Sequence, residues 1–420
     1  MQILKIGDRG AEVALLQTGL HRAGWDLARD GVFGSATRRA VTEFQRRHAL
    51  TPDGIFGPRT EAALSPWLRG YAIHTVRPGD TLWRIADRYD STLLALETAN
   101  PRLDPFDLRP GQQLVVPFLF PVVPTDIPWS TAATEYVLDG LQRRYPVMGR
   151  EAIGHSAGTM PLHALAFGDG PRRVLFTAAH HANEWITAPV LLKFAEDQLS
   201  ARTAGEEGAE ELFFRCRVVM VPVVNPDGVD LVTGAYPPGE RLEAAEAIAA
   251  SWPAIPWPSG WKANLAGTDL NLQYPAKWEE ARRIKFAQGY TRPAPRDYVG
   301  TAPLSAPESA ALAAFTRKVD PALVLAYHTQ GRVIYWRFGA LEPPGSAALA
   351  ERMAAVSGYA LGDAPYESSF AGYKDWFIQE FGRPGFTIEA GEGENPLPIR
   401  QFDRIYADNY PLLRLAALGE

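Results

Sequence analysis

A histidine and a glutamate three residues apart, His181 and Glu184, are the feature that most constrains this chain. They follow the apolar, β-prone run Val174-Leu175-Phe176 and precede residues 186–199, whose apolar spacing predicts an amphipathic helix. Open α/β sheets bind ligands at the carboxyl ends of their strands, so a strand, turn and helix in this order direct both side chains into one crevice. Both residues can bind zinc, although the pair alone also fits a polar helix start. We expect His181 to be the ligand and its neighbour His180 to be packed beside it.

Two later segments repeat the pattern of a buried strand that ends in a polar residue. The apolar run 322–327 ends in His328, and the run 385–388 ends in Glu389. His328 would be a third ligand, and Glu389 is a carboxylate that can take a proton from a water whose pKa the metal lowers. Either segment alone fits a strand end that faces solvent, but the set fits this poorly. The sequence therefore predicts one catalytic Zn²⁺ with a general base beside it.

Four short motifs occur in the order seen in zinc carboxypeptidases. They are His181-x-x-Glu184, Gly267-Thr268-Asp269-Leu270-Asn271, Tyr327-His328 and Phe386-Thr387-Ile388-Glu389. The resemblance covers about residue 127 to the C-terminus. It implies an α/β/α fold with a mixed central sheet, zinc on the two histidines and the first glutamate, and Glu389 as general base.

The departures from that family narrow the function further. The family's Asp-Leu-Asn-Arg run, whose Asn–Arg pair grips a terminal carboxylate, here ends in Leu272. A guanidinium binds a carboxylate bidentately, which leucine cannot do. The span 262–266 also has no arginine where the family carries an electrophilic one. With these two differences, the sequence resembles the bacterial γ-D-glutamyl-L-diamino acid endopeptidases, a branch of the family that cleaves peptidoglycan. Three more segments resemble that branch: 261–264, 372–377 and 391–398.

The resemblance also suggests substrate-binding residues. A γ-D-glutamyl residue has a free α-carboxylate beside the scissile bond, so the site needs a cation or donors there. Lys374 lies on the segment that shapes the specificity pocket in the resembling family, and it would hold this carboxylate or the side-chain carboxylate of diaminopimelate. Asp375 would orient the lysine or meet a substrate amine; alternatively, the two only stabilise a loop. Asn271, Arg332 and Tyr366 are the next candidates.

Residues 1–68 contain an internal repeat. The segment that begins at Asp30, Asp-Gly-Val-Phe-Gly, recurs from Asp53 as Asp-Gly-Ile-Phe-Gly, and each is a turn followed by a helix start. An apolar stripe that includes Val13 and Leu20 predicts an earlier helix. This module resembles the all-α three-helix peptidoglycan-binding domain; the alternative is a helical bundle without a ligand.

Residues 72–117 form a second module with the order strand, helix, helix, strand. It resembles the βααβ lysin-motif domain, which binds N-acetylglucosamine chains, and Trp83 is either a core residue or a platform for sugar. Residues 118–129 contain three prolines and predict an extended, semi-rigid spacer. The peptidase domain would then cover 130–420. Within it, residues 237–260 have no simple period, and their tryptophans either form a lip over the crevice or fill a small core of their own.

Composition and charge exclude other classes. The 420 residues carry a net charge of −6, which argues against a nucleic-acid partner. The single cysteine, Cys216, excludes an internal disulfide framework, and no apolar run is long enough to span a bilayer. We also expect no signal peptide, since the first residues lead directly into a folded module.

The function that fits these observations is that of a zinc-dependent peptidoglycan hydrolase. It would cleave the bond between γ-D-glutamate and an L-diamino acid, either diaminopimelate or lysine, while residues 1–117 bind the glycan strands. We expect it at the cell wall or on spores, with a cytoplasmic or mother-cell origin possible. Two alternatives are a carboxypeptidase that trims stem peptides and a non-catalytic protein that binds the cell wall or spore coat.

Overall fold

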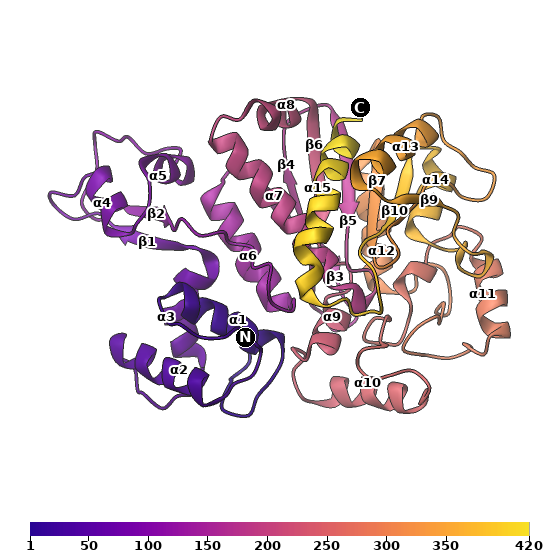
Figure 1. Ribbon diagram of the computed structural model, residues 1–420, viewed down its shortest axis with the longest axis horizontal. Coiled ribbons are helices and arrows are strands. Elements are labelled where there is room, and N and C mark those ends of the chain that lie inside the picture. Colours follow the sequence, from indigo (N-terminus) through magenta and orange to yellow (C-terminus); the bar gives the residue numbers. More distant parts are fainter. Residues whose placement is uncertain (420) are drawn as a thin grey trace. The chain divides into compact units, whose positions relative to one another are not determined.

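The computed structural model describes residues 1–419 and forms two compact units (Figure 1). The first unit contains Met1–Pro128, Ala132–Gly149 and Ala195–Ala209, and it therefore includes both small modules. The second contains Trp129–Thr131, Arg150–Phe194 and the chain from residue 210 onward, and it carries the large sheet. Across residues 1–419, no helix has both the length and the hydropathy that a bilayer span requires.

Three short helices form the N-terminal module, as the sequence predicts. The apolar stripe of the first helix is its core, since Val13 and Leu20 are fully buried. Gly19 lets the third helix approach closely, because a Cβ atom at this position would lie 2.8 Å from the Leu68 side chain. The helices are α1 (Ala11–Arg22), α2 (Ser35–Arg47) and α3 (Pro58–Arg69).

The first of the repeated turns is closed by a buried glutamine on α1. Gln17 donates from Nε2 to Asp30 Oδ1 (2.9 Å) and to Thr37 Oγ1 (3.1 Å), and its Oε1 accepts from the Gly31 backbone (2.8 Å). The Asp30 carboxylate also accepts from the backbone N–H of Val32 (2.9 Å). One side chain thus satisfies the turn and the first residues of α2.

The second turn repeats this arrangement around a buried glutamine on α2. Gln45 donates from Nε2 to Asp53 Oδ1 (2.9 Å) and to Thr60 Oγ1 (3.1 Å), and its Oε1 accepts from the Gly54 backbone (2.9 Å). Asp53 Oδ1 accepts from the Ile55 backbone N–H (2.9 Å). The sequence repeat is therefore also a repeat of hydrogen-bond pattern.

The second module has the predicted order of elements. Its helices begin at threonine caps: Thr81 Oγ1 accepts from the Arg84 N–H, and Thr92 Oγ1 from the Ala95 N–H. Trp83 is 64% exposed, so it is not part of the apolar core. The elements are β1 (Tyr71–Thr75), α4 (Leu82–Arg88), α5 (Leu93–Ala99) and β2 (Gln113–Pro117), with β1 and β2 antiparallel.

Residues 118–128 pack against the rest of their own unit. Val122 and Val123 are buried, and their backbone N–H groups donate to the two carboxylate oxygens of Glu196. Arg22 donates to the Pro121 carbonyl (2.8 Å). Burial of its apolar side chains packs this segment against its own unit, which also includes α6 (Thr131–Arg144) from residue 132 onward.

An eight-stranded mixed sheet forms the second unit, in the order β3-β4-β6-β5-β7-β10-β8-β9. The four central strands β6, β5, β7 and β10 are parallel to one another, whereas β4 and β8 are antiparallel to their central neighbours. The strands are β3 (Gly149–His155), β4 (Pro161–Phe167), β5 (Arg172–Thr177), β6 (Cys216–Val221), β7 (Leu323–His328), β8 (Val333–Tyr335), β9 (Ala360–Gly362) and β10 (Gly385–Glu389).

Helices cover the sheet, so its central strands are apolar on both faces. On one face, Leu175 and Val324 pack in a cluster with Leu312 of α12 (Pro307–Val319) and Phe377 of α14 (Tyr373–Phe381). Side chains alternate along a strand, and the intervening residues such as Phe176 are also buried. Helix α15 contacts β6, and Figure 1 shows it crossing in front of the sheet. The remaining helices are α7 (Thr187–Thr203), α8 (Glu207–Arg215), α9 (Pro226–Thr233), α10 (Glu240–Ala250), α11 (Trp278–Ala287), α13 (Ser346–Ser357) and α15 (Phe402–Leu418).

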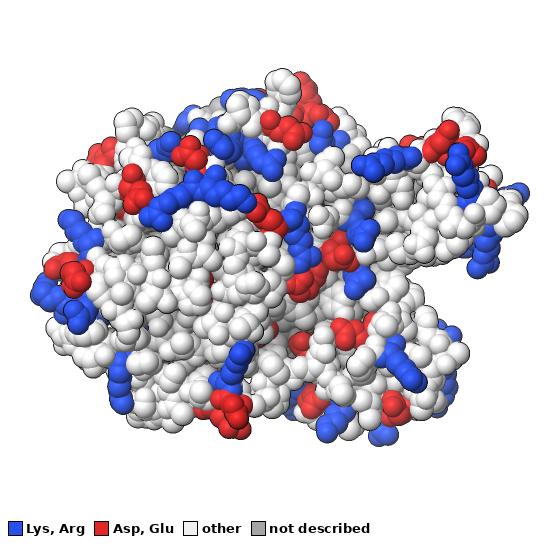
Figure 2. Space-filling model, turned by 180° about the vertical axis from the view of Figure 1, so that it is seen from behind, with Lys and Arg blue, Asp and Glu red and all other residues white. Residues whose placement is uncertain are grey.

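The segment 237–260 contains helix α10, which its sequence period does not reveal. Its tryptophans pack on nearby aromatic rings: Trp252 stacks on Tyr290, and Trp257 meets the edge of Trp261. Both tryptophans therefore pack on rings outside the segment, and Trp257 stays 36% exposed. On the face shown in Figure 2, basic and acidic side chains are interspersed.

Candidate metal centre and active site

The ends of three neighbouring parallel strands position the site. Strand β5 ends at Thr177, and a turn through Ala179, which has a positive φ of 49°, brings the chain to His181. A short 3₁₀ turn, Ala182–Glu184, then presents the glutamate. On the next strands, His328 is the last residue of β7 and Glu389 is the last residue of β10; the two are paired in register. Parallel strands end at the same edge of a sheet, so these side chains meet.

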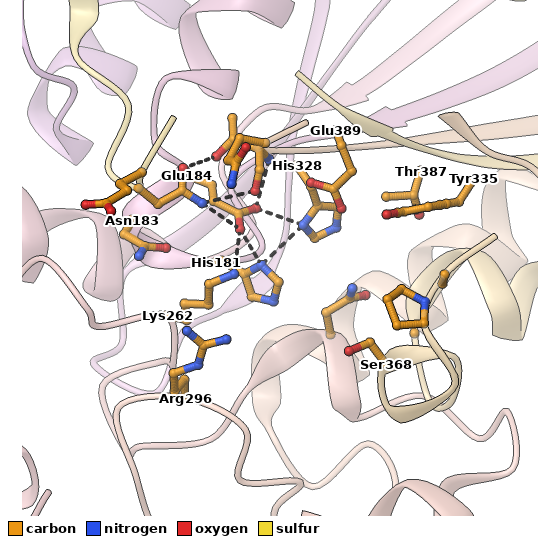
Figure 3. Close-up of a pocket in the computed structure, with 18 of the residues that line it drawn as sticks. His181, Asn183, Glu184, Lys262, Arg296, His328, Tyr335, Ser368, Thr387 and Glu389 are labelled. Atoms are coloured by element: carbon orange, nitrogen blue, oxygen red, sulfur yellow. Dashed lines mark hydrogen bonds and ion pairs between the residues drawn. The ribbon is translucent and has the colours of Figure 1, made fainter. Parts of the chain in front are cut away.

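The three predicted ligands converge on one point. His181 Nδ1 lies 2.9 Å from Glu184 Oε1, His328 Nδ1 lies 2.9 Å from Glu184 Oε2, and the two Nδ1 atoms are 3.2 Å apart. Among residues 1–419 this is the group of three whose candidate ligand atoms all lie within 4.8 Å of one another (Figure 3). Two imidazole nitrogens and a carboxylate are a donor set that zinc prefers.

The surroundings of these atoms fit a cation better than a closed hydrogen-bond network. His328 is 2% exposed, and its Nε2 atom has no hydrogen-bond partner in the described part of the chain. Its hydrogen-bond contacts with His181 and Glu184 are both made by the Nδ1 atom. Three groups with lone pairs aimed at one another would be satisfied by a shared metal ion, and these residues would hold zinc through the two Nδ1 atoms and the glutamate.

A carboxylate outside the ligand set fixes the orientation of His181. Asp269 Oδ1 lies 3.3 Å from His181 Nε2, the nitrogen opposite the ligand atom. Asp269 also accepts from the backbone N–H groups of Asn271 (3.1 Å) and Asp297 (3.2 Å). Burial opposes its charge, but His181 and Lys262 outweigh this and keep the pKa of Asp269 well below its usual range. Such partners set the tautomer of a ligating imidazole.

Lys262 also contacts the ligand cluster, and the sequence analysis gave it no role in the site. Its Nζ donates to Glu184 Oε1 at 3.0 Å, and its side chain is only 18% exposed. Burial opposes its charge, but Glu184 outweighs this and raises the pKa of Lys262 above its ordinary value. The segment 261–264 belongs to the family resemblance, but no spacing rule connects a lysine 78 residues away to Glu184.

A cavity of about 650 Å³ opens beside the ligands, and Glu389 lies on its wall. Burial, followed by repulsion from the Glu184 charge, raises the pKa of Glu389 to about 8, although Lys262 and His181 act in the opposite direction. A divalent cation on the ligands would favour the carboxylate form. A group with this position and proton affinity can both accept and return a proton.

Three of the predicted substrate residues line the same cavity: Asn271, Lys374 and Asp375. Lys374 and Asp375 are in contact as an ion pair, each with a side chain 7% exposed, and Lys374 Nζ also donates to the Arg337 carbonyl (2.7 Å). Asn271 Oδ1 accepts from the Tyr373 backbone (3.0 Å). The pair is thus well ordered at the cavity wall, and its role toward substrate stays a prediction.

Tyr366 and Arg332 are not among the residues that line the cavity. The Tyr366 hydroxyl donates to Glu280 (2.7 Å) on the outer surface, and the side chain is 62% exposed. Arg332 Nη2 pairs with Asp408 (3.2 Å). Their assignment to substrate binding remains a prediction that this geometry does not support. His180, in contrast, is fully buried and lies 3.3 Å from the Tyr274 hydroxyl, as expected for a packed histidine.

Comparison with known proteins agrees with this geometry. Residues 134–411 match the family model of the zinc carboxypeptidases. The chain is 42% identical to γ-D-glutamyl-L-diamino acid endopeptidase 1 of Lysinibacillus sphaericus, over 79% of this chain and 96% of the relative. The chain belongs to the zinc carboxypeptidase family. It is a zinc metallopeptidase and a homologue of that endopeptidase.

Other comparisons extend the relationship over the whole chain. Residues 9–64 match the peptidoglycan binding domain and residues 74–117 the LysM domain. An uncharacterized Bacillus subtilis protein, YqgT, is 37% identical over 66% of this chain and 74% of its own length. Carboxypeptidase A of Helicoverpa armigera shares the fold, with a TM-score of 0.53 at 16% identity, over 83% of this chain and 98% of that one.

The position at which this member of the family departs from the Asp-Leu-Asn-Arg motif is apolar in the structure. Leu272 is 8% exposed and packs with Trp278, Val299 and Ala371. The cluster gives no cation where the sequence motif of the family has an arginine. Three other cations line the cavity instead: Lys262, Arg296 and Lys374.

Proposed function

We propose that this protein is a peptidoglycan endopeptidase that hydrolyses the bond between γ-D-glutamate and an L-diamino acid in stem peptides. The main support is the His181–Glu184–His328 cluster beside Glu389, in a chain 42% identical to an endopeptidase named for this reaction. Leu272 supports endopeptidase rather than carboxypeptidase action, because the cavity has no guanidinium there to bind a terminal carboxylate.

The residues of the chain have separate tasks in this reaction. Zinc held by the three ligands would supply a Lewis acid that polarises the scissile carbonyl and lowers the pKa of water. Glu389 accepts a proton from the attacking water and later donates it to the leaving amine. Asp269 keeps His181 in one orientation, and Lys262 holds Glu184 while adding positive charge near the developing oxyanion.

Substrate binding on the leaving side is assigned to Lys374 and Asp375. The diamino acid carries an amine at the end of its side chain, and in diaminopimelate a carboxylate beside it. An ordered lysine–aspartate pair presents one partner of each sign to such an end. Asn271 is assigned to the backbone of the leaving residue.

The two N-terminal modules would hold the enzyme on its polymeric substrate. We assign residues 1–68 and 72–117 to wall binding, 118–129 to a packed connector and 130–420 to catalysis; the family matches at 9–64 and 74–117 support the first two. Binding to the wall raises the effective concentration of stem peptides at the active site. This role predicts association with the cell wall, including that of spores.

The decisive experiment is digestion of purified peptidoglycan by the full-length, zinc-loaded protein, with fragments identified by mass spectrometry. The proposal expects new amino termini on the diamino acid and muropeptides that end in D-glutamate. Release of single residues from the peptide end would instead indicate a carboxypeptidase. A chain that sediments with the wall but releases no fragment would be a binding protein only.

A further inference from the structure

Arg296 lines the cavity on a segment whose backbone is fixed on both sides. Before it, the Pro295 carbonyl accepts from the Lys262 backbone at 2.7 Å. After it, the Asp297 N–H donates to Asp269 Oδ2 at 3.2 Å. These partners are the residues that hold Glu184 and His181, so the position of Arg296 is tied to that of the metal ligands.

The side chain of Arg296 is held by one edge only. Its Nε donates to Asp297 Oδ2 (2.7 Å), and Asp297 Oδ1 in turn accepts from the largely buried Lys285 (2.6 Å). Among residues 1–419, no hydrogen bond or ion pair involves its two terminal nitrogens, and the side chain is 43% exposed. A guanidinium fixed in this way offers an open fork that matches a carboxylate in geometry and charge.

The other cations of the cavity are already engaged. Lys262 donates to Glu184, and Lys374 contacts both Asp375 and the Arg337 carbonyl. Arg296 is therefore the cation of this cavity with the most donors left for an anionic ligand.

The place of Arg296 identifies the half of the substrate it meets. Glu389 must return a proton to the leaving amine, so the amine half of the substrate lies on its side of the metal ligands. Figure 3 shows Arg296 below Lys262 and His181, across the ligand cluster from Glu389. The acyl half of the substrate then extends toward Arg296.

We propose that Arg296 determines specificity by binding the free α-carboxylate of the γ-linked glutamyl residue on the acyl side of the scissile bond. The inference rests on the proposed function, since it names the group that this site recognises in that substrate. It separates two carboxylate sites: Arg296 serves the acyl half, and the Lys374–Asp375 pair serves the diamino acid.

Two matched peptides test this assignment with the full-length, zinc-loaded enzyme. One is L-alanyl-γ-D-glutamyl-diaminopimelate, and the other carries an α-carboxamide in place of the glutamyl α-carboxylate. The unaltered enzyme should lose about 100-fold in kcat/KM on amidation, since a charge pair has lost one partner. Arg296→Gln should lose about as much on the acid peptide and almost nothing further on the amide.

Two further variants and two measurements separate loss of the Arg296 contact from loss of folding or of metal. Arg296→Lys keeps the charge without the fork and should recover part of the selectivity between the two peptides. Arg292→Gln, on the same loop but outside the cavity lining, should behave as the unaltered enzyme. Zinc content and thermal unfolding should be unchanged in all three variants.

The selectivity ratio decides the result. Equal losses on both peptides for Arg296→Gln, or no loss on either, would overturn the role of Arg296 and leave the proposed function intact. If the unaltered enzyme cleaved neither peptide at the γ-glutamyl bond, the proposed function itself would fail, and the inference with it.

Discussion

The glutamine-centred turns of the N-terminal module and the histidine–glutamate cluster of the peptidase domain are both polar networks built around buried side chains, but their hydrogen bonds are completed to different degrees. In the turns, each Asp-Gly segment finds its partners within the module: Gln17 and Gln45 each use both ends of the amide. In the cluster, two imidazoles and a carboxylate point their lone pairs at one another, and His328 Nε2 has no partner in the described chain.

The difference separates scaffold from site. A network whose donors and acceptors are all matched has nothing left for a ligand, so the repeated motif that identifies the N-terminal module is the part that shapes its fold. In the cluster, Glu184 already accepts from Lys262, yet its oxygens and the two imidazole Nδ1 atoms still lie 2.9 to 3.2 Å from one another, a spacing that a shared proton or metal ion completes.

The largest effects are expected at the histidine–glutamate cluster and at Glu389 beside it. Glu389→Gln keeps the size of the side chain but cannot accept a proton, so turnover should fall on the order of 10²- to 10⁴-fold while the zinc content is unchanged. His328→Ala removes a ligand and should lose most of the metal as well as the activity. Metal analysis of the purified variants, together with hydrolysis of a soluble stem peptide, measures both effects.

His21→Ala is the matched control for these variants, because His21 is an exposed histidine on α1. It should change neither metal content nor turnover. Full zinc occupancy in His328→Ala would mean that the ligands are assigned incorrectly, and normal turnover in Glu389→Gln would remove its role as general base.

Much of the candidate site could be predicted from the sequence because its residues lie at strand ends or in the turns that follow them. His181, His328 and Glu389 each follow an apolar run, and parallel strands bring their carboxyl ends to one edge whatever the length of the connections. The roles of these residues as zinc ligands and general base followed from the family resemblance. The three-helix and βααβ modules were predictable for a similar reason, since their turns and caps are local in sequence.

The rest of the site depends on loops that carry no period. Arg296 and Lys262 reach the cavity from irregular segments joined by backbone hydrogen bonds, which the sequence does not encode as a motif. Tyr366 and Arg332 have surface partners that no spacing rule could anticipate. The packing of residues 118–128 could not be predicted from their prolines, because burial of Val122 depends on a glutamate 74 residues away.

An intermediate effect is expected when the glutamine hydrogen bonds of one Asp-Gly turn are removed. Gln45→Leu leaves the Gly54 N–H and the Thr60 hydroxyl without their buried partner, which should cost about 1–3 kcal/mol of stability in that module. Gln17→Leu should cost a similar amount, since its bonds are the same in kind. Hydrogen exchange of the α1–α3 amides in the full-length chain reports this locally, while hydrolysis of a soluble stem peptide should not change.

Gln113→Leu is the control, because this glutamine lies exposed on β2. It should leave exchange in α1–α3 unaltered. A Gln45 variant as protected as the unaltered chain would show that the closed network does not stabilise the module.

The smallest effect is a pH dependence of the same turns. Hydrogen bonds from Gln17 and the Val32 backbone lower the pKa of Asp30, and those from the Ile55 backbone and Gln45 lower the pKa of Asp53. A carboxyl group whose pKa is depressed by folding contributes its stability above the unfolded value, near 4, and loses it as the pH falls through the folded value. Protection of α1–α3 amides should therefore be constant from neutral pH down to about pH 5 and should decline below pH 4.

Both carboxylates are largely solvated, so the loss should be smaller than that caused by either glutamine variant. The double variant Asp30→Asn/Asp53→Asn keeps an acceptor oxygen at each turn but cannot titrate, and its protection should vary less between pH 5 and pH 3. If its pH profile matched that of the unaltered chain, the acid sensitivity would come from other carboxylates of the module.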